Sequence, residues 1–173
     1  MSAARIFLAP GASGGVEGLA RHADGLRRRG FDVDLVSLPR GAAERAVAPY
    51  RAALAGSELG ATAIGGHSFG GRVASLIAAD TPPAALVLLS YPLHAPGRHE
   101  AWDARTAHWP SISCPVLLLA GESDPFARLD LLRRAAERLP DGTLRTWPRL
   151  GHGLAPVLGE ALDQVADFIH ERT

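Results

Sequence analysis

Short, continuous runs of apolar residues constrain the fold of this chain most strongly. Residues 85–89 read Ala-Leu-Val-Leu-Leu and residues 116–120 read Val-Leu-Leu-Leu-Ala, with no polar side chain in either run. Such runs are typical of strands buried on both faces of a parallel sheet, whereas a strand with one solvated face alternates apolar and polar residues. Parallel strands need long crossovers, usually helices, so the two runs predict an α/β protein.

Strand-length and helix-length patterns alternate along the rest of the chain. Strands are expected at 6–9, 31–36, 61–65, 85–89, 116–120 and 143–147, and helices at 17–29, 42–59, 72–79, 126–139 and 156–170. Right-handed crossovers then predict a doubly wound, mostly parallel six-stranded sheet with helices on both faces and no cap domain. The length of 173 residues fits one domain, so residues 1–173 are expected to form a single domain.

Composition excludes several classes of partner. Basic and acidic residues balance at 18 each, which does not fit the strongly basic domain of a typical nucleic-acid-binding protein. The single Cys114 excludes an internal disulfide framework. No apolar stretch approaches the roughly 20 residues of a membrane-spanning helix, and the N-terminal apolar run is too short for a secretory signal. We therefore expect a cytoplasmic protein with neither a nucleic-acid nor a membrane partner.

A serine follows the third expected strand within the motif Gly66-His67-Ser68-Phe69-Gly70. This segment matches G-x-S-x-G, the nucleophile elbow, in which a sharp strand-to-helix turn exposes the serine hydroxyl. The amino end of the following helix also favours the negative charge that develops during attack. The alternative is an inert serine in a glycine-rich turn, but the apolar strand before it and the helical pattern after it favour a nucleophile.

Two further strand ends carry the groups that a serine nucleophile needs. In an open α/β sheet, ligands bind outside the carboxyl ends of the strands. His152 lies between glycines just after the last expected strand, and its imidazole would accept the Ser68 proton as a general base. Asp124 follows the strand at 116–120 and would orient the imidazole. Glu122 is the rival carboxylate, and a turn or helix cap is the structural alternative for Asp124.

Backbone N–H groups would complete the site by holding the oxyanion of the tetrahedral intermediate. We assign one to Phe69, directly after the nucleophile, and the other to Ala12 in the glycine-rich loop at 10–15. The same loop could in principle hold a dinucleotide, but G-x-G-x-x-G is absent, so no cofactor is expected.

Taken in order, these segments resemble the α/β-hydrolase superfamily across nearly the whole chain. The matching segments are 8–15, 65–75, 118–125 and 151–153. The compact form resembles the small lidless branch of dienelactone-hydrolase-like and testis-expressed protein 30-like proteins, which implies a sheet without the two antiparallel N-terminal strands of larger relatives. Two departures stand out: the first loop carries Pro10-Gly11 where relatives often have His-Gly, and the elbow carries serine where dienelactone hydrolases use cysteine.

Residues 91–114 lie where larger hydrolases insert a lid, and their shortness predicts an open site. The aromatic and imidazole side chains of this segment are candidates for the substrate pocket: Tyr91, His94, Trp102 and Trp109. Its histidines match no common metal-ligand spacing, so no metal site is expected.

The leading hypothesis is a serine hydrolase that cleaves a small ester or thioester through an acyl-enzyme. Its runner-up is a non-enzymatic hydrolase-fold protein that serves as a binding module or scaffold, because superfamily membership fixes fold better than function. A perhydrolase or haloperoxidase-like activity would use the same three residues. The expected partner is a small-molecule substrate, and the acyl chain, the leaving group and the oligomeric state are left open.

Overall fold

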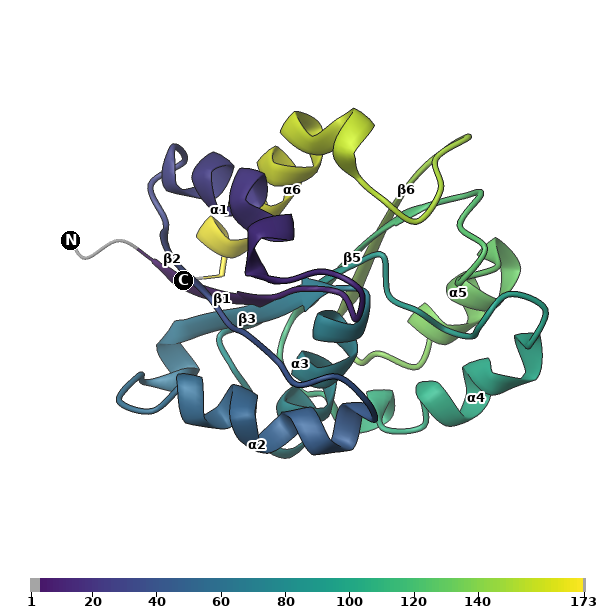
Figure 1. Ribbon diagram of the computed structural model, residues 1–173, viewed down its shortest axis with the longest axis horizontal. Helices are drawn as coiled ribbons and strands as arrows, with labels where there is room; N and C mark the ends of the chain where they lie inside the picture. The colour runs from purple at the N-terminus through teal and green to yellow at the C-terminus, as the bar shows by residue number, and fades with distance from the viewer. Residues whose placement is uncertain (1–3, 173) are drawn as a thin grey trace.

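A computed structural model describes residues 4–172, and in it six strands form one sheet (Figure 1). The strand order is β2-β1-β3-β4-β5-β6. The strands are β1 (Arg5–Ala9), β2 (Asp32–Leu35), β3 (Thr62–His67), β4 (Ala85–Leu89), β5 (Val116–Gly121) and β6 (Gly142–Trp147). Every neighbouring pair is parallel, so the predicted fold class is confirmed and the sheet is wholly parallel.

Helices cover both faces of the sheet (Figure 1). The α-helices are α1 (Ala20–Arg27), α2 (Ala43–Ala53), α3 (Phe69–Asp80), α4 (Trp102–Arg105), α5 (Leu129–Ala136) and α6 (Leu158–His170). Helices α1 and α6 pack in the same apolar cluster on one face, whereas α2, α3 and α5 contribute to the cluster on the other. This arrangement is the doubly wound one that the crossover rule predicts.

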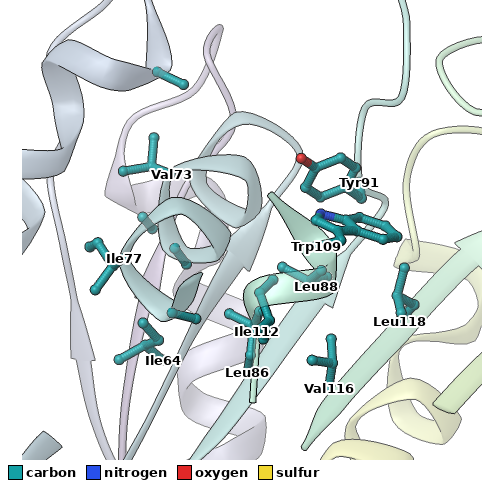
Figure 2. Packing of buried hydrophobic residues seen from close by; sticks show 14 of the residues in the cluster. Ile64, Val73, Ile77, Leu86, Leu88, Tyr91, Trp109, Ile112, Val116 and Leu118 are labelled. Carbon is teal, nitrogen blue, oxygen red and sulfur yellow. The ribbon is translucent and has the colours of Figure 1, made fainter. Parts of the chain in front are cut away.

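Alternation of side chains along each strand feeds the two apolar layers separately. In β4, Leu86 and Leu88 point into the layer beneath α3, while Val87 and Leu89 point into the layer beneath α1 and α6. Figure 2 shows the first of these layers. Because both faces are covered, no residue of the strand needs to be polar, which explains the continuous apolar run.

Several helices are shorter than the sequence pattern predicts. The helix expected at 17–29 begins as a 3-10 turn, η1 (Val16–Leu19), and continues as α1, and the helix expected at 42–59 ends at Ala53. Gly30 and Gly56, with φ of 89° and 83°, turn the chain after α1 and α2. The connections still bring the chain back to the same end of the sheet each time, so that all strands run in the same direction.

The segment between β4 and β5 is short and packed rather than an inserted domain. It contains two 3-10 turns, η3 (His99–Ala101) and η4 (Trp109–Ser111), on either side of α4. Two more 3-10 turns, η2 (Leu59–Ala61) and η5 (Ala155–Val157), precede β3 and α6. Within residues 4–172, no helix has the length and apolar character needed to cross a membrane.

Candidate active site

Ser68 sits on a strained turn between β3 and α3. Its φ of 50° and ψ of −116° lie where residues with a side chain rarely occur. The elbow leaves no room on either side, because a Cβ atom on Gly66 or Gly70 would collide with the carbonyl oxygen of Ala9. The Ser68 N–H donates to the carbonyl of Leu89 at 2.8 Å, which fixes the turn to β4. The hydroxyl is thereby held at the carboxyl edge of the sheet.

His152 and Asp124 approach this hydroxyl from the loops after β6 and β5. The His152 Nε2 lies 2.8 Å from the Ser68 Oγ, and its Nδ1 lies 2.8 Å from the Asp124 Oδ2. Asp124 is 4% exposed, and its other oxygen accepts the backbone N–H of Phe126 at 2.8 Å. With a proton on Nδ1, the imidazole donates to Asp124 and its Nε2 is free to accept the Ser68 hydroxyl proton.

Glu122, the rival carboxylate, takes a different partner. Its Oε1 accepts a hydrogen bond from the hydroxyl of Thr146 at 2.8 Å, across from β5 to β6. The loops of Asp124 and His152 are also linked directly, since the N–H of Ser123 donates to the carbonyl of Leu150 at 2.9 Å. The structure therefore brings Asp124, and not Glu122, to the imidazole.

The glycine-rich loop after β1 forms the opposite wall of the site. It makes a turn in which the N–H of Gly14 donates to the carbonyl of Gly11 at 3.3 Å, with Ala12 inside the turn. Among the turn and loop hydrogen bonds of residues 4–172, none uses the N–H of Ala12 or of Phe69. Both residues line one cavity of about 260 Å³ beside the loop. This placement suits the two oxyanion donors that the sequence predicts.

A second cavity of about 540 Å³ opens directly over Ser68. The ring of Phe126 lies against the ring of His152, with centroids 4.5 Å apart, and closes one side. The full lining is Pro10, Gly11, Ala12, Ser13, Gly14, Gly15, Gly18, Leu19, His67, Ser68, Phe126 and His152. The first loop and η1 thus supply most of the space next to the nucleophile.

His67 is a residue of the site that sequence reasoning missed. Its Nε2 lies 3.0 Å from the carbonyl oxygen of His152, and its ring packs against Gly11 of the first loop. Burial lowers the pKa of His67, so the ring is neutral and its Nε2–H donates to that carbonyl. The only signal was a polar residue at the variable position of the elbow motif. His67 ties the nucleophile turn to the loop of the base.

A second buried imidazole lies on α1, behind His67. Both ring nitrogens of His22 are buried without a hydrogen-bond partner in the described part of the chain. Burial, with smaller contributions from His67 and Arg21, lowers the pKa of His22 to about 4. His22 is therefore neutral at pH 7. It is not among the residues that line the cavity over Ser68.

The structure corrects the predicted substrate pocket, beginning with Tyr91 and Trp109. Both are fully packed in the core, at 1% and 0% exposed, with ring centroids 4.9 Å apart (Figure 2). The Tyr91 hydroxyl donates to the carbonyl of Arg105 at 2.8 Å. Their large apolar rings gain more from burial under the chain than from lining an open site. Neither residue lines the cavity at Ser68.

His94 and Trp102 also lie away from that cavity. His94 is 1% exposed, and its ring bonds two backbone groups, the N–H of Arg128 at 3.0 Å and the carbonyl of Ala95 at 2.9 Å. Trp102 lies under the guanidinium of Arg138, 4.3 Å from the ring centroid. Among residues 4–172, no three His, Cys, Asp or Glu side chains are grouped so as to hold a metal ion.

The wholly parallel sheet, the strained serine between β3 and α3, and the His152–Asp124 pair at the same edge define the class of α/β hydrolases. Residues 41–167 match the model of a family described as an alpha/beta hydrolase domain, and the chain belongs to that family. The predicted superfamily is thereby confirmed, whereas the small lidless branch remains a prediction.

Individual relatives are distant. A segment of 53 residues is 43% identical to a candidate carbamate hydrolase, RutD, of Caulobacter sp. (strain K31), covering 31% of this chain and 20% of that protein. The chain thus spans only a fifth of the length of this relative.

Solved structures resemble the whole chain. A monoacylglycerol lipase of Paleococcus ferrophilus has a TM-score of 0.83 at 16% identity, with 98% of this chain and 95% of that chain covered. The esterase Pf2001 of Pyrococcus furiosus has a TM-score of 0.83 at 15% identity, with 99% and 84% covered. At these identities the likeness shows the fold alone.

Proposed function

We propose that this protein is a serine hydrolase that cleaves a small ester or thioester through an acyl-enzyme intermediate. The observation that carries the proposal is the pair of hydrogen bonds that joins Asp124 to His152 and His152 to Ser68. Each is 2.8 Å long, and Ser68 and His152 line a cavity. The solved structures named as a lipase and an esterase support the same chemistry on this fold.

Acylation begins when the Ser68 Oγ attacks the carbonyl carbon and His152 takes the hydroxyl proton on Nε2. The buried carboxylate of Asp124 stabilises the imidazolium that results. The N–H groups of Ala12 and Phe69 hold the oxyanion, and each such donor contributes about 3 kcal/mol to the transition state. His152 then passes its proton to the leaving alcohol or thiol, and the acyl group remains on Ser68.

Deacylation repeats these steps with water. His152 takes a proton from a water molecule, whose oxygen attacks the acyl carbon, and the proton returns to the Ser68 Oγ as the acid leaves. A carbamate would follow the same path, which is consistent with the name of the Caulobacter relative. Within residues 4–172, only short helical segments separate β4 from β5, and we expect water to reach the acyl-enzyme from solvent.

The single-domain organisation of residues 1–173 and the cytoplasmic location belong to the same proposal. Both come from the sequence, and a hydrolase of this kind needs neither a cap domain nor a membrane to complete the three-residue chain.

The direct test is the intact mass after treatment with a fluorophosphonate probe. We expect one adduct on the wild type and none on Ser68→Ala. Ser13→Ala is the matched control, since Ser13 lines the same cavity but is bonded to neither His152 nor Asp124, and it should keep the adduct. A folded wild type without an adduct would refute the serine hydrolase and favour a non-enzymatic binding module or scaffold.

A further inference from the structure

Among residues 4–172, those that line the cavity over Ser68 include no Asp, Glu, Lys or Arg. Its polar side chains are two serines and two imidazoles, and its remaining lining is proline, alanine, leucine, phenylalanine and glycine. The His67 imidazole is neutral because burial lowers its pKa. The Asp124 carboxylate lies behind the His152 ring and is not part of the lining. A charged ligand would therefore lose its hydration here without an opposite charge on the lining itself. The Glu17 carboxylate lies against Gly15 but belongs to the lining of the smaller cavity.

The position of the base decides which part of a substrate enters this cavity. His152 must pass its proton to the leaving atom, so that atom must come within hydrogen-bond reach of Nε2. His152 lines the 540 Å³ cavity and is absent from the lining of the 260 Å³ cavity. The leaving atom and the first atoms attached to it consequently lie in the larger cavity.

The smaller cavity has a different character. Ala12 and Phe69 line it, and so do the charged side chains of Glu17 and Arg40. The polar and the apolar space thus share the first loop as lining, and of the two only the apolar one is lined by both Ser68 and His152.

We propose that the 540 Å³ cavity is a leaving-group site for an uncharged, apolar alcohol or thiol of the size of a benzyl or branched alkyl group. This inference rests on the proposed hydrolase function. The volume lies within the range of about 300–1,000 Å³ that holds compact organic ligands. The rings of Phe126 and His152 form an aromatic wall, and Leu19, 2% exposed, anchors the opposite side.

The glycines of the first loop and η1 contribute no side chain to the 540 Å³ cavity. A Cβ atom on Gly14 or Gly18 would meet nothing within 4 Å, and neither residue has a positive φ. A Cβ atom at Gly18 therefore fits the fold, and Gly18 lines the cavity, so we expect a larger side chain there to reduce the space. Gly60 offers a matched control, because it also lies in a 3-10 turn, has the same open surroundings and lines neither cavity beside the first loop.

The experiment compares kcat/KM for acetate esters that differ only in the leaving alcohol. Acetylcholine and 3,3-dimethylbutyl acetate have the same shape and differ in one positive charge, so the neutral ester should be preferred by about tenfold or more, the equivalent of about 1.4 kcal/mol. Equal use of the two esters, or preference for the cation, would overturn the inference.

The second arm tests the location of the site. Gly18→Leu should lower the ratio of kcat/KM for benzyl acetate over ethyl acetate by about tenfold or more, as expected when a side chain fills a pocket of this kind. Gly60→Leu should leave the ratio unchanged. An unchanged ratio in Gly18→Leu overturns the inference, and if the fluorophosphonate adduct still forms, the proposed function survives. Absence of both adduct and hydrolysis refutes the two together.

Discussion

Substitution of His67 by phenylalanine would remove the hydrogen bond between the nucleophile turn and the loop of the base. The imidazole Nε2–H donates to the His152 carbonyl at 3.0 Å, and the ring also packs against Gly11. His67→Phe retains a ring of similar size and removes the donor. His67→Gln is the matched variant, because its side-chain amide can place a donor near the position of Nε2.

The expected loss follows from the worth of one hydrogen bond. A neutral bond of this kind contributes about 0.5–1.5 kcal/mol net. Since 1.36 kcal/mol off the barrier corresponds to a factor of about ten in rate, kcat should fall by about 2- to 12-fold in His67→Phe. The change in kcat is the informative one, because the His67 ring also lines the cavity over Ser68 and its replacement changes the surface that the substrate meets. His67→Gln should recover most of the lost kcat.

The assay is steady-state hydrolysis of a neutral acetate ester, with the rate of fluorophosphonate labelling as a second readout. Thermal unfolding of both variants controls for loss of structure. If His67→Gln is as slow as His67→Phe, the hydrogen bond is not what matters. If His67→Phe keeps the wild-type kcat, the link between the two loops is dispensable.

Three further predictions address the carboxylate proposed to orient His152, the hydrogen bonds of Tyr50 to Gly65 just before the elbow, and the dependence of stability on pH. Asp124→Asn should lower kcat by about 10³-fold or more with the fold intact, whereas Glu122→Gln should have a small effect; a reversed order in steady-state kinetics would exchange the two roles. Tyr50→Phe should lower the free energy of unfolding in urea by about 1–3 kcal/mol, because its buried hydroxyl accepts from the N–H of Gly65 and lies 2.7 Å from the carbonyl of the same residue; an unchanged midpoint would contradict this. The pKa of His22 is lowered by burial to about 4, so the unfolded chain takes up a proton first as the pH falls from about 6.5 to 4, and the free energy of unfolding must fall across that window. His22→Leu should reduce this slope and preserve stability at pH 7, since both ring nitrogens lack a partner in the described structure. Part of the slope should remain, because burial also lowers the pKa of His108 to about 4 and that of His67; a slope equal to that of the wild type would assign the acid sensitivity elsewhere.

The sheet and the meeting of Ser68, Asp124 and His152 could be predicted because they depend on order along the chain. Continuous apolar runs indicate buried parallel strands, and parallel strands place all their carboxyl ends at one edge. Ser68, Asp124 and His152 each follow such an end, so strand order alone brings them to the same edge. Their 2.8 Å contacts then require only loops of the right length.

The lining of the cavity could not be predicted, because it depends on which way loop side chains point. Tyr91 and Trp109 have the composition of a binding pocket, yet they fill the core beneath α3 (Figure 2). The residues that do shape the space include Gly14 and Gly18, which have no side chain to signal a role. His67 was overlooked for a related reason: its partner is a backbone carbonyl 85 positions away.

The backbone around Ser68 is crowded, whereas the space around Gly18 is open. The two regions therefore differ in how many substitutions they can accept as this hydrolase acquires new substrates. Gly66 and Gly70 admit no side chain, so sequence drift at the elbow is closed on steric grounds. A Cβ atom on Gly14 or Gly18 would meet no atom within 4 Å. Substitutions can therefore accumulate along the first loop and η1 while Ser68, His152 and Asp124 keep their relative positions. Libraries for directed evolution of selectivity should vary the first loop and η1. These segments line the same cavity as Ser68, although they precede it by about fifty residues in the chain.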